Sequence, residues 1–291
     1  MTGETAFIHS LRGLATHPAA RGLMDDAAVL EIGGKAIVLT HDLVVEGVHF
    51  LPGTDMADIA WKLVAVNLSD LAAKGAEPLG VLLGFMLGEG QQRFVEGLED
   101  VLDHYGVPLL GGDTSSGGPP RTFDLTAIGE AVHTPVPSRA DARQGDAIFV
   151  TGQLGAALLG FEALKQGGAG DTGAYLRPLA RLAEGQALAP HVTAMMDISD
   201  GLLLDAARMA RASGVTMAID SAAVPIATPE DRRMDALRWG DDYELLFTLP
   251  EGVEPPVPAT RIGSVEPASG APVTLDGKPL TEADNLGYEH G

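Results

Sequence analysis

The stretch DIAWKLVAVNLSDLAAKGAEPLGVLLGFML, residues 58–87, decides how this chain folds. Apolar side chains recur at helical spacing through its first part, which predicts a helix over 58–75. Gly75 is a typical helix stop, and Pro78 lies just beyond it. Residues 79–87 then form an uncharged apolar run of strand length. We therefore expect a helix that is followed at once by a buried strand.

Short strands and helices alternate irregularly on both sides of this stretch. Before it, strands are expected over 28–32 and 36–40, joined by a Gly33-Gly34 turn. After it, the patterns predict helices over 91–105, 154–165, 178–188 and 200–212, and strands over 107–110, 122–132, 147–151, 193–198, 215–219, 243–249 and 261–265. Because the order is not a strict β-α-β repeat, the pattern favours an α+β fold of mixed α/β content.

The chain is long enough for two domains. Its 291 residues are about twice the length of a typical domain. Pro135, Pro137 and the polar residues 138–146 interrupt the regular patterns and are typical of a linker. We therefore expect an N-terminal domain over 1–135 and a C-terminal domain over 136–291.

Composition and charge exclude several classes of function. The 40 acidic residues outnumber the 19 basic ones, so the formal net charge is −21. A field of that sign repels nucleic acid and anionic membrane surfaces, and neither is an expected partner. No apolar run reaches the roughly 18 residues of a membrane helix, and the first residues lack the pattern of a secretory signal. With no cysteine, disulfides and thiolate sites are excluded, and a cytoplasmic location is expected.

Carboxylates stand beside Gly, Ser and Thr in six short segments. These segments contain Asp25-Asp26, Asp42, Asp70, Gly112-Asp113, Asp197 with Asp200, and Asp241-Asp242. Each one alone has an ordinary structural explanation: Asp200 is a candidate N-cap, and Asp70 a candidate exposed helix residue. Together they indicate a site that gathers several carboxylates, because such a site needs a hard cation to offset their repulsion.

Carboxylates beside glycines are also what nucleotide-dependent phosphoryl transfer requires. Mg²⁺ takes oxygen ligands, and glycine lets main-chain N–H groups approach phosphate. No Gly-x-x-x-x-Gly-Lys-Ser/Thr motif is present, and the protein-kinase motifs are absent too. The residues by themselves indicate a Mg²⁺-nucleotide enzyme of an unfamiliar fold.

Seven segments resemble those of the thiamine-monophosphate kinase family, in the superfamily that includes aminoimidazole ribonucleotide synthetase. They run in the family's order over almost the whole chain: MDDAAVL (24–30), THDLVVEGVHF (40–50), DIAWKLVAVNLSDLAAKGAEP (58–78), LLGGDTSSG (109–117), SRADARQGDAIFVTGQLG (138–155), MDISDGLLLD (196–205) and WGDDYELLF (239–247). The combination is highly specific for this family.

The resemblance implies a reaction and a fold. The reaction is the ATP-dependent phosphorylation of thiamine monophosphate to thiamine diphosphate, with ATP in a cleft and several Mg²⁺ ions as cofactors. K⁺ is a further candidate cation. The implied fold is aminoimidazole ribonucleotide synthetase-like, with two α/β domains, and the N-terminal domain forms a homodimer through its sheet.

The resemblance also implies the residues of the site. The metal ligands would be Asp26, Thr40, His41, Asp42, Asp70, Asp113, Asp197 and Asp200, with Asp42 and Asp113 as anchors. The ATP contacts would be Tyr105, Gly112, Asp113, Arg139 and Ser199. The substrate contacts would be His49, Asp241 and Tyr288.

Four positions depart from the family pattern. Met24 stands where the family usually has Gly, and His41 where it usually has a hydroxyl residue. Ser116 replaces a common Arg, and Asp241 replaces a common Glu that is one methylene longer. The chain is also shorter than is usual over residues 221–238.

The implied chemistry is a direct in-line transfer. A phosphate monoester oxygen is already anionic near pH 7 and needs no strong base, so Arg139 and metal ions would mainly offset repulsion from ATP. Two other readings stay open: a sibling ATP-dependent synthetase of the superfamily, and a nucleotide-binding relative with weakened turnover.

Overall fold

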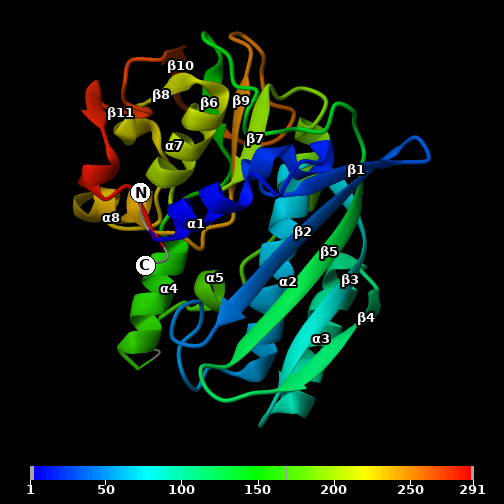
Figure 1. Ribbon diagram of the computed structural model, residues 1–291. Helices are drawn as coiled ribbons and strands as arrows, with labels where there is room; N and C mark the ends of the chain where they lie inside the picture. Colours follow the sequence, from blue (N-terminus) through cyan, green and yellow to red (C-terminus); the bar gives the residue numbers. More distant parts are fainter. Residues whose placement is uncertain (1–2, 168–169, 290–291) are drawn as a thin grey trace.

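The computed structural model describes residues 3–167 and 170–289, which build two units that each contain one sheet (Figure 1). The first sheet has the strand order β1-β2-β5-β3-β4 and the second β12-β11-β8-β10-β6-β9-β7. The expected α+β architecture with two mixed α/β units is confirmed.

The elements of the N-terminal unit follow one another within the first 131 residues. They are α1 (Gly3–Leu11), the 3-10 helix η1 (Pro18–Leu23), β1 (Ala28–Ile32), β2 (Lys35–Val45), α2 (Met56–Ala73), β3 (Ala76–Leu87), α3 (Gln91–Tyr105), β4 (Leu109–Ser116) and β5 (Thr122–Ala131). Helices α2 and α3 cover one face of the sheet (Figure 1), and the buried side chains of alternate strand residues pack beneath them.

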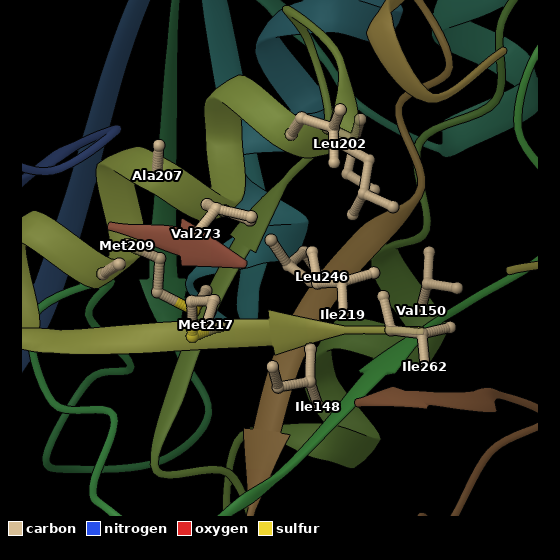
Figure 2. Close-up of a cluster of buried hydrophobic side chains, with 14 of the residues drawn as sticks. Ile148, Val150, Leu202, Ala207, Met209, Met217, Ile219, Leu246, Ile262 and Val273 are labelled. Carbon is tan, nitrogen blue, oxygen red and sulfur yellow. The ribbon is translucent and has the colours of Figure 1, made fainter. Parts of the chain in front are cut away.

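The elements of the second unit begin after the segment 132–146. They are β6 (Ala147–Val150), α4 (Ala156–Lys165), α5 (Gly173–Leu176), α6 (Leu182–Leu188), β7 (Ala194–Asp197), α7 (Leu202–Ser213), β8 (Val215–Ile219), η2 (Ser221–Ala223), η3 (Glu230–Arg232), α8 (Arg233–Arg238), β9 (Leu245–Leu249), β10 (Thr260–Pro267), β11 (Val273–Leu275), β12 (Lys278–Leu280) and η4 (Glu282–Asp284). Figure 2 shows the main core, where Leu246, Ile262 and Met217 of the sheet meet side chains of α7.

Helix α2 is buried on nearly all sides because it lies between the two units. It packs against β2 and β5 of its own sheet and also contacts α6 and β7 of the second unit. Gly185 of α6 approaches Ala72 so closely that a Cβ there would lie 2.0 Å from the carbonyl oxygen of Ala72. On the same side, Phe149 and Phe247 stack with ring centroids 5.5 Å apart. Side chains of α2 therefore reach the junction of the two units.

Several boundaries differ from the sequence expectation for physical reasons. Strand β2 continues to Val45 because it pairs with β5 from Ile37 to Val45, so Asp42 lies within a strand and not at its end. Asp113 likewise lies inside β4, where a turn was expected. The strand expected from residue 243 begins at Leu245 because Tyr243 has a positive φ of 51°. The patterns did not indicate α1, α8, β11 or β12.

Candidate active site

A cleft of about 880 Å³ lies where the two units meet. Strand β2 and helix α2 form one wall, and the segments 196–200, 238–243 and 285–288 form much of the other. Of the residues implied by the sequence, those that line it are Asp26, Asp42, His49, Asp70, Arg139, Asp197, Ser199, Asp200, Asp241 and Tyr288. The fold thus brings together side chains from both ends of the chain.

Three carboxylates form a tight acidic cluster in this cleft. Asp26 precedes β1, Asp70 lies near the end of α2, and Asp197 ends β7. One carboxylate oxygen from each of them lies within 4.8 Å of the others. Taken by itself in the sequence, Asp70 is a candidate exposed helix residue. In the structure it lines the cleft, because α2 is enclosed by both units.

Burial and mutual repulsion alter the protonation of the cluster. Burial raises the pKa of Asp70 well above its usual range, and the charges of Asp42 and Asp197 raise it further. Burial also raises the pKa of Asp197 to about 8, and the charge of Asp26 adds to this shift. A hydrogen bond from Ser69 Oγ, 2.6 Å long, acts in the opposite direction. Without a bound cation, the cluster therefore retains protons near neutral pH.

A buried lysine, which the sequence pattern did not indicate, lies beside the cluster. Lys74 Nζ contacts the carboxylate of Asp25 and lies 2.8 Å from Asp26 Oδ2. Burial acts to raise the pKa of Asp25, but the charges of Lys74 and Arg21 outweigh it and hold that pKa well below its usual range. Arg139 forms an ion pair with Asp26 as well. In the sequence, Lys74 is marked only by its place directly after the apolar run Leu71-Ala72-Ala73 near the end of the expected helix.

A second unexpected residue, Asp205, shapes the segment that carries Ser199 and Asp200. Its Oδ2 accepts hydrogen bonds from the main-chain N–H groups of Ser199 and Asp200, at 3.1 and 3.0 Å. Arg208 bridges the carboxylates of Asp205 and Asp200. Burial raises the pKa of Asp205 to about 7, although the charge of Arg208 opposes the shift. Asp200 is not an N-cap, because Gly201 occupies that position of α7.

The opposite part of the cleft contains the residues implied as substrate contacts. Asp241 Oδ2 lies 2.9 Å from Lys62 Nζ, and Tyr243 Oη donates to Asp241 Oδ1 at 3.0 Å. The main-chain N–H of Asp241 donates to the Ser199 carbonyl at 2.8 Å, which joins this end of the cleft to the acidic end. Asp241 has a φ of 64°, a left-handed conformation that side chains other than Gly, Asn and Asp seldom adopt.

His49 and Tyr288 are also tied to the main chain of this region. His49 Nδ1 accepts a hydrogen bond of 3.0 Å from the Val45 N–H, and the Tyr288 N–H donates to the Asp200 carbonyl at 3.0 Å. The last described segment of the chain therefore closes over the Asp200 loop.

Thr40 and His41 lie on opposite faces of β2, and neither residue lines the cleft. Thr40 is buried, and its hydroxyl donates to the Asn67 carbonyl at 3.2 Å. His41 lies on the exposed face of the sheet, 2.9 Å from Thr126 Oγ1. The structure brings neither side chain into the cleft.

Three further implied residues lie elsewhere in the single chain. Tyr105 Oη accepts a hydrogen bond of 2.8 Å from the Ala180 N–H, outside the cleft. Gly112 and Asp113 belong to β4, an exposed edge strand. Asp113 pairs with Gly84 on the sheet face that the helices leave uncovered, where the carboxylate of Asp124 occupies the space above Gly84.

Met24 and Ser116, at two positions that depart from the family pattern, also lie outside the cleft lining. Met24 follows η1, and its N–H donates to the Arg21 carbonyl at 3.3 Å. Ser116 is the last residue of β4 and is exposed.

Comparison with known proteins assigns the chain to a family. Residues 24–131 match the model "AIR synthase related protein, N-terminal domain", and residues 143–268 match that of the C-terminal domain. A thiamine-monophosphate kinase of Salmonella typhimurium is 37% identical over 299 residues, 92% of this chain and 91% of the relative. The chain belongs to the thiamine-monophosphate kinase family. The family resemblance inferred from the seven segments is thereby confirmed.

Solved structures of thiamine-monophosphate kinases share this fold. The structure described as "AaThiL complexed with AMPPCP and TMP" has a TM-score of 0.86 and 31% identity, covering 96% of this chain and 94% of that chain. The enzyme from Stenotrophomonas maltophilia has a TM-score of 0.78 and 33% identity, covering 94% of this chain and 96% of that chain.

Within the described residues, no helix is long and apolar enough to cross a membrane.

The arrangement is suited to binding phosphate compounds through cations. An acidic cluster can hold hard metal ions, and Arg139 beside it offers an N–H donor fork for a phosphate group. The Asp241 end, in contrast, offers hydrogen-bond acceptors next to the aromatic rings of Trp239 and Phe161, whose centroids are 5.0 Å apart. One cleft thus combines a site for phosphate with a site for a polar aromatic group.

Proposed function

We propose that this protein transfers the terminal phosphoryl group of ATP to thiamine monophosphate and forms thiamine diphosphate. The observation that carries the proposal is the cleft itself. The cleft is lined both by the cluster of Asp26, Asp70 and Asp197 and by Asp241, whose carboxylate can accept hydrogen bonds. A ligand with a phosphate at one end and an aminopyrimidine at the other fits these two chemistries.

The donor set of the cluster fits Mg²⁺. All of its groups are carboxylates, the oxygen ligands that Mg²⁺ prefers, and the raised pKa values of Asp70 and Asp197 indicate a missing positive charge. Asp26, Asp70 and Asp197 would hold the ions, with Asp42 and Asp200 beside them. When bound, the ions would neutralise phosphate oxygens and hold them in place. No feature of residues 3–167 and 170–289 argues for K⁺, and we propose Mg²⁺ alone.

The protein's own groups position and neutralise the two substrates. Arg139, paired with Asp26 here, would bind an ATP phosphate once metal ions compensate the carboxylates. Ser199 would contribute to ATP binding from a loop that Asp205 holds rigid. Because the acceptor oxygen is already anionic, no side chain needs to act as a general base, and the transfer would proceed in line.

The acceptor would lie at the other end of the cleft. Asp241 would accept a hydrogen bond from the thiamine pyrimidine, and His49 and Tyr288 would contact the same molecule. Lys62 and Tyr243 hold the Asp241 carboxylate, so its position does not depend on the ligand.

The uncovered face of the N-terminal sheet supports a homodimer. Large apolar side chains that face away from the helices are exposed, including Leu43 at 46%, Leu82 at 38% and Leu110 at 55%. Asp113 lies on the same face. A second copy packed on this face would cover these leucines and bring Asp113 and Gly112 close to a partner, which is how we propose that they contribute to the site. Tyr105 lies on the helix-covered side of the sheet, so this contact would not reach it.

A coupled assay of ADP release tests the function. With Mg²⁺-ATP, we expect release to depend on thiamine monophosphate and not on thiamine or on a formylglycinamidine-type acceptor of the sibling synthetases. Asp42→Asn should lower the rate at least about 100-fold while the protein remains folded, because it removes a charge that the site needs for metal. Asp100→Asn, an exposed change on α3, is the matched control. Equal ADP release without thiamine monophosphate would refute the proposal.

A further inference from the structure

We infer that Lys62 is a positioning residue of the acceptor site, which fixes Asp241 and offsets its charge so that the site selects an uncharged N–H donor. This inference rests on the proposed function, because it concerns how the acceptor is recognised.

Three groups surround the ammonium group of Lys62. Its Nζ lies 2.9 Å from Asp241 Oδ2, donates to the His49 carbonyl at 3.0 Å, and stands 4.0 Å from the ring centroid of Tyr175. Only 4% of the side chain is exposed. Each direction in which an ammonium group can donate is thus used, and the side chain has no freedom to turn toward solvent.

Lys62 connects two of the residues proposed to bind the acceptor. The His49 carbonyl that accepts from Lys62 also accepts from Tyr175 Oη at 3.2 Å. Loss of the ammonium group would release Asp241, whereas the His49 carbonyl would keep its hydrogen bond from Tyr175 Oη. A defect in acceptor binding is therefore expected from a residue that does not itself line the cleft.

The charge of the pair decides what Asp241 can recognise. Lys62 balances the carboxylate, and one oxygen accepts from Lys62 while the other accepts from Tyr243 Oη, 3.0 Å away. A carboxylate oxygen has two lone pairs, so acceptor capacity remains on the cleft side. Because Lys62 already balances its charge, the Asp241 carboxylate is better suited to accept a hydrogen bond from a neutral amino group, such as that of an aminopyrimidine, than to bind a cation.

One helix also sets the separation between the two ends of the site. Lys62 and Asp70 both belong to α2 and are eight residues apart, which is about 12 Å along a helix axis. Because both residues belong to this one helix and Lys62 holds Asp241, α2 sets the distance from the Asp241 carboxylate to the metal cluster. Acceptors in which the phosphate and the amino group are closer together should therefore react poorly.

The test compares Lys62→Met, which keeps most of the side-chain volume, with Lys35→Met. Lys35 is the matched control because its ion pair with Glu130 is exposed on the sheet. For Lys62→Met we expect KM for thiamine monophosphate to rise at least about 10-fold while KM for ATP changes less than about twofold. Lys62→Arg should recover part of the loss. A lower melting temperature with both KM values unchanged would show a merely structural role and overturn the inference.

A double variant guards against poor folding and separates the inference from the proposed function. Lys62→Met leaves the Asp241 charge unpaired, whereas Lys62→Met with Asp241→Asn removes both charges and should fold. Because Lys62 acts through Asp241, the double variant should raise KM for thiamine monophosphate no more than Asp241→Asn alone, within about twofold. If the rise in KM for thiamine monophosphate in the double variant equalled the product of the rises in the two single variants, Lys62 would not act through Asp241, and the inference would be refuted. Wild-type protein that neither binds nor phosphorylates thiamine monophosphate would refute the proposed function first, and the inference with it.

Discussion

At the scale of single residues, the cleft depends on buried charges that need partners. Asp25 and Asp26 have Lys74 and Arg139 as partners, and Asp241 has Lys62. Among residues 3–167 and 170–289, no Lys or Arg forms an ion pair with Asp70 or Asp197, and burial raises the pKa of each carboxyl group. Burial therefore favours the protonated form of both carboxyl groups, and a bound metal ion would favour the ionised form again.

The raised pKa values predict how stability depends on pH and Mg²⁺. The pKa of Asp197 rises from 3.8 to about 8 in the folded chain, and that of Asp70 also rises. The folded state thus binds protons that the unfolded chain has released, so the contribution of these groups to stability is lost as pH rises from about 4 to about 8. We expect the melting temperature without metal to fall over this range.

Mg²⁺ should counter that loss, and more strongly at high pH, because fewer protons must then be displaced. Melting curves with and without Mg²⁺ at about pH 6 and about pH 8.5 measure the effect. Asp197→Asn is the control and should flatten the pH dependence. A stabilisation by Mg²⁺ that is independent of pH would contradict this account.

A second prediction concerns the shorter acid at position 241. Asp241→Glu should preserve or improve kcat/KM for thiamine monophosphate, because the added methylene extends the carboxylate further into the cleft. Its φ of 64° favours Asp, so a stability loss of up to about 1 kcal/mol should accompany the change. Asp241→Ala should raise KM for thiamine monophosphate far more than KM for ATP. If Asp241→Ala lowered only the melting temperature, Asp241 would have no part in acceptor binding.

At the scale of elements, the position of the cleft depends on how α2 packs against α6. Gly185 of α6 touches the main chain of α2 at Ala72, two residues from Asp70. Nothing larger than glycine fits, because a carbonyl oxygen cannot move aside as a flexible side chain can. This contact ties the second unit to the helix that carries both Asp70 and Lys62.

The packing of α6 predicts the effect of Gly185→Ala. A Cβ at this position would lie 2.0 Å from the Ala72 oxygen, so the two helices must separate. We expect a destabilisation of about 1–3 kcal/mol, despite the better helix propensity of alanine, together with a fall in turnover. Gly118→Ala, where a Cβ would meet nothing within 4 Å, is the control and should change stability by less than about 0.5 kcal/mol. Urea unfolding measures the free energy of unfolding of each variant. If Gly185→Ala were as stable as Gly118→Ala, the close contact between α6 and α2 would be refuted.

At the scale of the whole molecule, the two sheets differ in how they are covered. Both faces of the second sheet meet buried apolar clusters, one under α7 and one beside α2 and α6. The first sheet has α2 and α3 on one face, whereas Leu43 and Leu82 on the other are exposed. The exposed face is the one that the proposed homodimer would cover.

The uncovered sheet face predicts a dimer. Sedimentation at micromolar concentration should give twice the mass of the chain, and Leu82→Asp should shift the protein toward the monomer by placing a charge on that face. Asp113→Asn should abolish turnover without changing the sedimentation coefficient, because it removes a proposed site charge and no apolar contact. Val95→Asp, an exposed change on α3, is the control. A wild-type monomer would contradict both the dimer and the role given to Asp113.

The sequence by itself determined the helix and strand of residues 58–87, the mixed architecture and the family, since helical periodicity, stop signals and motif order are local properties. It also supplied most of the residues that line the cleft. Local patterns could not show that Lys74 is buried beside Asp25 or that Asp205 holds the Ser199 loop, because these contacts join elements far apart or depend on a bend in the chain.

Only the tertiary structure decided which of the implied residues meet. Thr40, His41 and Asp42 are consecutive, yet only Asp42 lines the cleft. Thr40 shares the face of Asp42 but is buried against Asn67 of α2, whereas His41 lies on the opposite face because side chains alternate along a strand. Asp42 and Asp113 lie on opposite faces of one sheet for the same reason. The sequence pattern of a strand predicts that it has two faces. The packing of α2 and α3 determines which of these faces belongs to the core and which remains open.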